Sequence, residues 1–166
     1  MGCKYSVARA GIMAGVFLLV AGMAACSKKP QQMTLGQAGG PVAPGTSQDF
    51  SVNAGDKVYF TVDSAQLSAQ AQTTLRAQAT WLNKYPQYSV TIEGHADERG
   101  TREYNIALGA RRAASVRTFL SGIGVNPARL RTISYGKERP VATCNDISCW
   151  SQNRRAVTVL NARAGS

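Results

Sequence analysis

The sequence predicts an α/β domain in which strands and helices alternate along the chain. Alternating apolar residues at 58–62, 89–94, 131–135 and 156–160 are typical of strands. Apolar residues at helical spacing occur in 67–82 and again in the segment that ends near Gly122. Elements in this order favour a two-layer arrangement with crossover connections between strands.

The first 25 residues have the organisation of a signal peptide for secretion. Lys4 and Arg9 give a positive amino end, an apolar run follows, and small residues precede Cys26. The apolar run is shorter than the roughly 20 residues of a membrane-spanning helix. The segment resembles the bacterial lipobox, with Met23 where Leu is usual, so we expect lipidation of Cys26. An ordinary signal peptide, with Cys26 incidental, is the alternative.

Residues 26–48 are rich in Lys, Gln, Gly, Pro and Ala and poor in bulky apolar side chains. Such a segment buries too little surface to offset its ordering entropy. We therefore expect the lipidated Cys26 to be followed by a flexible tether that spans on the order of 25 Å. Ser27 favours an anchor in the outer membrane, with the domain in the periplasm.

Residues 49–162 are expected to form one folded domain of ordinary size. Two alternating runs, 50–52 and 58–62, surround the turn-like Asn53-Ala54-Gly55-Asp56 and predict a hairpin. A helix at 67–82 ends before Pro86, and a strand covers 89–94. Thr101 can cap a second long helix that runs to about Gly122. A short helical turn at 126–127 and strands at 131–135 and 156–160 complete the domain.

The basic charge of the chain restricts its partners. Removal of residues 1–25 takes away Lys4 and Arg9 and no acidic residue, so the formal net charge falls from +10 to +8. Such a domain could bind nucleic acid, anionic lipid or an anionic wall polymer. Export argues against nucleic acid, and charge alone does not choose between the other two.

Cys144 and Cys149 are the two cysteines of the predicted domain, and the residues between them are turn-like. Because exported proteins fold in an oxidising compartment, we expect a disulfide that closes a small surface loop. Two reduced thiols are the alternative. A metal site is not expected, because the single His95 with Glu93 and Asp97 is too sparse a ligand set.

Asn105, Leu108 and Arg112 share one face of the second long helix. That face turns toward the core, so Arg112 should be buried and should need an acidic partner. Asp97, at the preceding strand-to-helix corner, is the candidate. Either the two form an internal salt bridge, or they bind a ligand with an ammonium and a carboxylate on one carbon. The side-chain end of meso-diaminopimelate in peptidoglycan is such a ligand.

Other reactive patterns are weak. No Ser or Cys stands in the context of a nucleophile, which argues against a hydrolase. Of the pair Arg154-Arg155, we expect one to be a surface charge and the other to pair with an acid.

Five motifs in order resemble the family of peptidoglycan-associated lipoproteins, which carry an OmpA-like domain: Val58-Tyr59-Phe60-Thr61-Val62-Asp63, Glu93 to Asn105, Leu108-Gly109-Ala110-Arg111-Arg112-Ala113, Ser134-Tyr135-Gly136-Lys137-Glu138 and Asn153-Arg154-Arg155-Ala156-Val157. The resemblance implies an α+β sandwich: a mixed four-stranded sheet covered on one face by two long helices, with an extra N-terminal strand or hairpin.

The same resemblance implies a binding site without catalysis. Asp97 would meet the ammonium of diaminopimelate and Arg112 its carboxylate, while Asp63 would close the cleft from the end of the first strand. The remaining walls would be Arg99, Asn105 and Leu108. The loop between the two cysteines is absent from many relatives, and no binding role is assigned to it.

The resemblance further implies that the protein tethers the outer membrane to the wall and engages the Tol machinery, chiefly TolB, in envelope integrity and cell division. No cofactor is expected apart from the lipid on Cys26. Two alternatives remain: an exported enzyme that acts on wall peptides in the same cleft, and a structural lipoprotein in which Asp97 and Arg112 form only an internal bridge.

Overall fold

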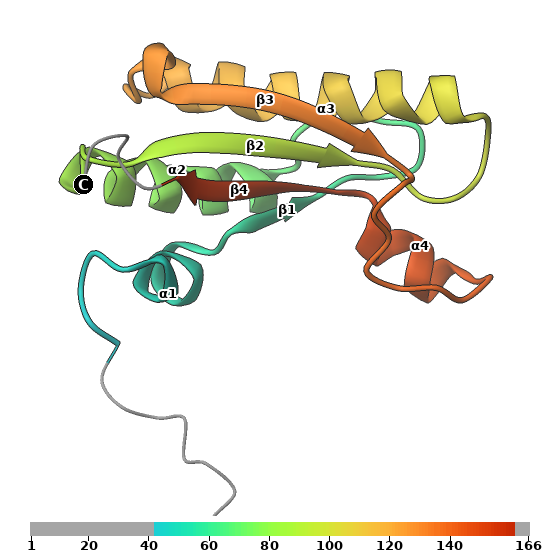
Figure 1. The fold of residues 1–166 in the computed structure, drawn as a ribbon, viewed down its shortest axis with the longest axis horizontal. Coiled ribbons are helices and arrows are strands. Elements are labelled where there is room, and N and C mark those ends of the chain that lie inside the picture. Colours follow the sequence, from blue (N-terminus) through green and yellow to red (C-terminus); the bar gives the residue numbers. More distant parts are fainter. Residues whose placement is uncertain (1–41, 162–166) are drawn as a thin grey trace, which may run out of the picture. The chain divides into compact units, whose positions relative to one another are not determined.

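The computed structural model describes residues 42–161, which form an α/β fold (Figure 1). The predicted signal peptide, Cys26 and most of the predicted tether lie outside these residues. The elements in order are α1 (Ser47–Asp49), η1 (Phe50–Ala54), β1 (Lys57–Tyr59), α2 (Ala69–Lys84), β2 (Ser89–His95), α3 (Arg102–Gly122), η2 (Pro127–Arg129), β3 (Leu130–Gly136), α4 (Ile147–Asn153) and β4 (Arg155–Asn161).

The four strands form one mixed sheet in the order β1-β4-β2-β3. β2 pairs in parallel with β3, and α3 is the crossover between them. β4 lies antiparallel to both β1 and β2. Figure 1 shows α2 and α3 on the same face of this sheet. The predicted mixed four-stranded sheet with two long helices on one face is therefore confirmed.

Residues 47–54 are helical, so the predicted N-terminal strand or hairpin is wrong. The hydroxyl of Thr46 caps α1 by accepting a hydrogen bond from the Asp49 N–H at 3.1 Å. Phe50 and Ala54, one helical turn apart, are both buried, whereas Val52 is 64% exposed. The apolar residues of this segment thus follow a helical period, although their short spacing in the sequence also fits a strand.

Contacts of the domain begin before the predicted boundary at Asp49. The Gly45 N–H donates to the Asp49 carboxylate at 2.8 Å, and the Tyr88 hydroxyl donates to the Gly45 carbonyl at 2.7 Å. The Asp49 carboxylate also accepts from Trp81 Nε1 of α2 at 2.7 Å. The chain is therefore joined to the domain at Gly45, beside the amino end of β2.

Both long helices begin at hydroxyl caps. Ser68 accepts from the Ala71 N–H, and Thr101 accepts from the Tyr104 N–H at 3.2 Å. The cap at Thr101 and the end of α3 at Gly122 confirm the predicted bounds of that helix. The helices pack on the sheet through a buried apolar cluster that includes Leu75, Leu82, Val90, Ile92, Val116 and Leu120.

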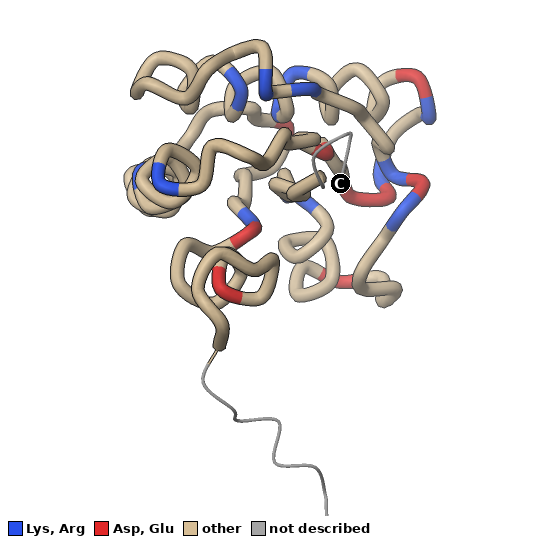
Figure 2. Tube along the Cα trace, turned by 60° about the vertical axis from the view of Figure 1, so that its left-hand side comes forward, with Lys and Arg blue, Asp and Glu red and all other residues tan. Residues whose placement is uncertain are grey.

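Charged side chains are spread over several elements. Figure 2 shows basic positions along both helices and strands, with several acidic positions directly beside basic ones. Among residues 42–161, no helix is both long enough and apolar enough to cross a membrane.

The backbone of α3 touches that of β2 at two glycines. A Cβ atom added to Gly94 would lie 1.8 Å from the Gly109 carbonyl oxygen, and one added to Gly109 would lie 2.8 Å from that of Gly94. A side chain at either position would push α3 away from the sheet. The two glycines therefore set the distance between α3 and the end of β2. The candidate site lies between these two elements and depends on that distance.

We expect Gly109→Ala to lower the free energy of unfolding by about 1–3 kcal/mol, because neither backbone can yield without repacking the core. Chemical denaturation measures this change. Gly122→Ala is the matched control: within residues 42–161, no atom outside the adjoining helix backbone lies within 4 Å of the added Cβ, and alanine favours the helix. Equal stability of the two variants would contradict the close approach.

Candidate functional site

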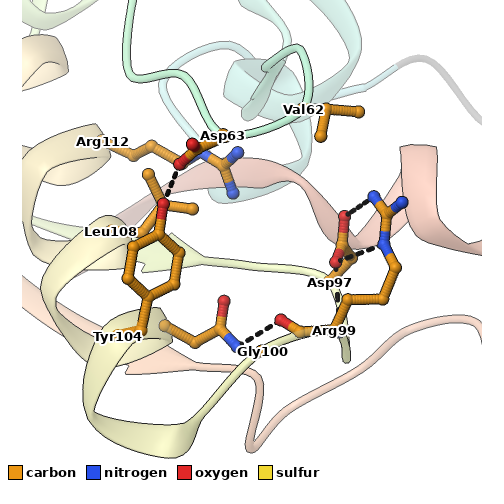
Figure 3. A pocket seen from close by; sticks show the side chains of 9 residues that line it. Val62, Asp63, Asp97, Arg99, Gly100, Tyr104, Leu108 and Arg112 are labelled. Atoms are coloured by element: carbon orange, nitrogen blue, oxygen red, sulfur yellow. Dashed lines mark hydrogen bonds and ion pairs between the residues drawn. The ribbon is translucent and has the colours of Figure 1, made fainter.

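A cavity of about 270 Å³ opens at the carboxyl ends of β1 and β2, beside the first turns of α3. All six residues predicted as ligand contacts line it. Figure 3 shows five of them, Asp63, Asp97, Arg99, Leu108 and Arg112, around the cavity on the segment after β1, the β2–α3 loop and α3. The lining consists of Val62, Asp63, Asp97, Arg99, Gly100, Tyr104, Asn105, Leu108 and Arg112. The structure thus brings the predicted residues together, while their binding role stays a prediction.

Arg112 is a fully buried cation at the base of this cavity, with an exposed fraction of 0%. Its guanidinium donates to three backbone carbonyls: Nε to Ser64 at 2.8 Å, Nη1 to His95 at 2.7 Å and Nη2 to Thr61 at 3.1 Å. Burial lowers the pKa of Arg112 to about 10, so the group is still protonated at neutral pH. Within residues 42–161, these bonds use three of its five N–H groups.

The internal salt bridge between Asp97 and Arg112, one of the two alternatives, is not formed in the structure. Asp97 instead pairs with Arg99, whose Nη2 donates to it at 2.6 Å and whose Nε donates at 3.1 Å. Arg154 Nη1 donates to the same carboxylate at 3.3 Å. The expectation that Arg112 needs an acidic partner was wrong, because carbonyl oxygens at strand ends also accept the N–H groups of a buried guanidinium.

Asp97 is ionised in this setting. Burial by itself would raise the pKa of its carboxyl, but the hydrogen bonds from Arg99 and Arg154 outweigh burial, and the pKa lies below its usual value. Its two oxygens accept from the Arg99 N–H, Nε and Nη2 and from Arg154 Nη1. A ligand ammonium would therefore have to replace at least one of these donors.

Asp63 and Tyr104 form the outer wall of the cavity. Asp63 has a positive φ of 52°, which turns the chain after β1 toward α3. The Tyr104 hydroxyl donates to the Asp63 carboxylate (Figure 3). Sequence reasoning missed Tyr104, although its spacing of four residues from Leu108 places both on adjacent positions of one helical face.

Asn105 fixes the loop between β2 and α3. Its side-chain nitrogen donates to the carbonyls of Arg99 and Thr101, at 2.8 and 3.0 Å. Asn105, Leu108 and Arg112 are all buried, as their shared helical face predicted. The polar end of this face thus holds the loop that carries Asp97.

One of the pair Arg154-Arg155 has its predicted role and the other does not. Arg154 pairs with an acid, Asp97, as expected for one of the two. Arg155 is also buried and is not a surface charge: its Nη2 donates to the Arg139 carbonyl at 3.2 Å. The error arose because Arg155 begins β4, where the pairing partner β1 and the loop at Arg139 cover it.

Cys144 and Cys149 are joined by a disulfide, with their Cα atoms 5.5 Å apart. With Asp146 they form the group of closely spaced potential metal ligands found in the described residues. Because disulfide sulfurs are not thiolates, this group is not a metal site while the bond is intact.

His95, at the end of β2, is buried with an exposed fraction of 1%. Neither ring nitrogen has a hydrogen-bond partner within residues 42–161. Its Nε2 lies 3.7 Å from the Glu93 carboxylate, too far for a hydrogen bond. Burial, assisted by the positive charges of Arg155 and Arg139, lowers the pKa of His95 to about 4. The ring is therefore neutral at pH 7.

Comparison with known proteins places this chain and its fold in a defined group. The model of the OmpA family matches residues 59–155. A peptidoglycan-associated lipoprotein of Brucella abortus is 58% identical over 159 residues, which cover 94% of this chain and 95% of the relative. One from Mesorhizobium japonicum is 61% identical over 150 residues, 90% of this chain and 89% of the relative.

A crystal structure also matches. The peptidoglycan-associated lipoprotein from Burkholderia pseudomallei superposes with a TM-score of 0.62 at 46% sequence identity, over 64% of this chain and 90% of that chain.

We expect the free energy of unfolding to fall as the pH drops from about 6.5 to about 4, at up to about 1.4 kcal/mol per pH unit from His95. In this window the unfolded chain binds a proton at this histidine and the folded chain does not. Denaturant titrations at a series of pH values measure the slope. His95→Phe, an aromatic side chain that does not titrate, should have a shallower slope; an unchanged slope would assign the effect to other groups.

Proposed function

This chain belongs to the OmpA family and, within it, to the peptidoglycan-associated lipoproteins, and from this membership we propose that it binds peptidoglycan non-covalently through meso-diaminopimelate. The relatives are binding proteins, and the chain is not an enzyme. The residues that line the cavity include no Ser, Cys or His that could act as a nucleophile or general base.

The observation that carries the proposal is the pairing of opposite charges in one cavity. Asp97 supplies a carboxylate for the ligand ammonium, and Arg112 has N–H groups beyond the three that its carbonyl partners accept. A free amino-acid head group requires both charges at once. At roughly 30 Å³ per water molecule, the cavity of about 270 Å³ has room for such a head group.

Arg99 occupies the place on Asp97 that we assign to the ligand ammonium. In the structure it holds the acceptor positions of Asp97 that the ammonium would take. Its side chain is 43% exposed, against 10% for Asp97, so Arg99 is the partner that can move. Binding then exchanges one cation on Asp97 for another, which avoids leaving a partly buried carboxylate without a counter-charge.

The anchor at the other end of the chain completes the proposed function. We propose that Cys26 carries the lipid and that residues 26–48 connect it to the domain, so that the protein links the outer membrane to the wall. The family resemblance also supports TolB and other Tol proteins as partners, with a role in envelope integrity and cell division.

We expect Asp97→Asn to weaken binding to diaminopimelate-type peptidoglycan about 10-fold or more, because a charged hydrogen bond is lost. The full chain, purified in mild detergent, is sedimented with purified wall at physiological ionic strength. Asp56→Asn is the matched control, since Asp56 is an acid at the opposite end of β1 that pairs with Lys57.

The ligand provides a second control. Lysine-type peptidoglycan has the ammonium of the stem-peptide side chain but not its carboxylate, so it should bind clearly more weakly. Arg112→Lys keeps the charge of Arg112 but not its planar fork, and should narrow the difference between the two walls. Equal binding of both walls by the unaltered protein would overturn the assignment to diaminopimelate, and unchanged binding by Asp97→Asn would overturn the site.

A further inference from the structure

The β2–α3 loop, which forms one wall of the cavity, is contacted by α4. None of the residues of α4 line the cavity itself. The guanidinium carbon of Arg99 lies 4.2 Å from the centre of the Trp150 ring, within the range of a cation–π contact. Trp150 Nε1 donates to the Glu98 carboxylate at 2.9 Å. One ring thus contacts two consecutive residues of the β2–α3 loop.

Arg99 lies between this ring and Asp97. Its Nε and Nη2 atoms face the carboxylate, and its guanidinium carbon lies over the indole ring (Figure 3 shows the side toward Asp97). An exposed arginine otherwise has many accessible rotamers, and fixing one of them costs entropy. The indole restricts Arg99 before any ligand arrives.

α4 is itself held at both ends. The disulfide between Cys144 and Cys149 closes the loop that leads into the helix, and Cys149 is buried directly before Trp150. At the other end, the Asn153 carboxamide accepts from the Val141 N–H at 2.8 Å and donates to the Ala142 carbonyl at 2.7 Å. The direction of the indole is therefore set by a short, cross-linked element.

We propose that Trp150, held by the disulfide-closed α4, is a positioning residue for wall binding that acts through Arg99. While Arg99 pairs with Asp97, the indole aligns it. When a ligand ammonium takes over Asp97, the indole and Glu98 keep the displaced guanidinium at the rim of the cavity. This inference rests on the proposed function and assigns a binding role to the loop between the two cysteines.

The first test is the affinity of the full chain in detergent for a soluble muropeptide that contains meso-diaminopimelate, measured by calorimetry. Trp150→Ala should weaken binding about 3- to 10-fold, because the indole is the contact left to Arg99 once a ligand ammonium has displaced it from Asp97, so that the loss costs more in the bound state than in the free one. Trp150→Phe keeps a ring under Arg99 and should stay within about twofold of the unaltered protein. Tyr59→Ala, which removes an exposed aromatic side chain from β1, is the control and should have no effect.

The second test is a double-mutant cycle between the disulfide and the indole. Replacing both cysteines, Cys144→Ala with Cys149→Ala, should weaken binding in the unaltered background and add almost nothing in the Trp150→Ala background. Equal losses in both backgrounds would show that the disulfide acts by another route.

The outcomes separate this inference from the proposed function. Loss of binding in Asp97→Asn together with full binding in Trp150→Ala would overturn the inference and leave the proposed function standing. A loss in Trp150→Phe as large as in Trp150→Ala would also overturn it, since the stacked ring would then not be the cause. Failure of the unaltered protein to bind the muropeptide would overturn both.

Discussion

The hydrogen bonds of one buried cation hold together the three chain segments from which the cavity is built. Arg112 projects from α3, and its acceptors are carbonyls of the segment after β1 and of the end of β2. Without it, three carbonyl groups would lose their donor in a place that water reaches poorly. The same guanidinium forms the base of the cavity. The side chain that joins these segments is thus also the one proposed to meet the ligand carboxylate.

The sequence was sufficient for features that depend on local periodicity. The spacing of Asn105, Leu108 and Arg112 correctly predicted one buried face, and Thr101 correctly predicted the start of α3. The same reasoning failed for Phe50 and Val52, because two apolar residues separated by one position fit the beginning of a strand as well as one helical turn. Over so short a segment, only the tertiary partners, such as Trp81 against Asp49, decide between them.

Contacts between segments far apart in the sequence were the features that the sequence did not predict. That Arg154 would reach Asp97 follows from the antiparallel register of β4, which places its first residues beside the end of β2. No local pattern contains that register. The contact of Trp150 with Arg99 is of the same kind, since α4 begins more than forty residues after the loop that it supports. That Arg112 donates to carbonyls and not to Asp97 likewise depends on the tertiary structure, which brings the segment after β1 and the end of β2 to its guanidinium.

The attachment of the chain at Gly45 has a mechanical consequence. Gly45 is held beside the amino end of β2 by Tyr88, whereas the cavity lies beyond the carboxyl end of the same strand. A pulling force between a membrane anchor and a wall ligand would therefore run along the length of β2. β2 is bonded on both sides, to β3 and to β4, so the force would shear two ladders of hydrogen bonds at once. Sheared ladders yield together, whereas ladders pulled from one end open bond by bond. Such a force would load the domain in the direction in which its sheet resists most.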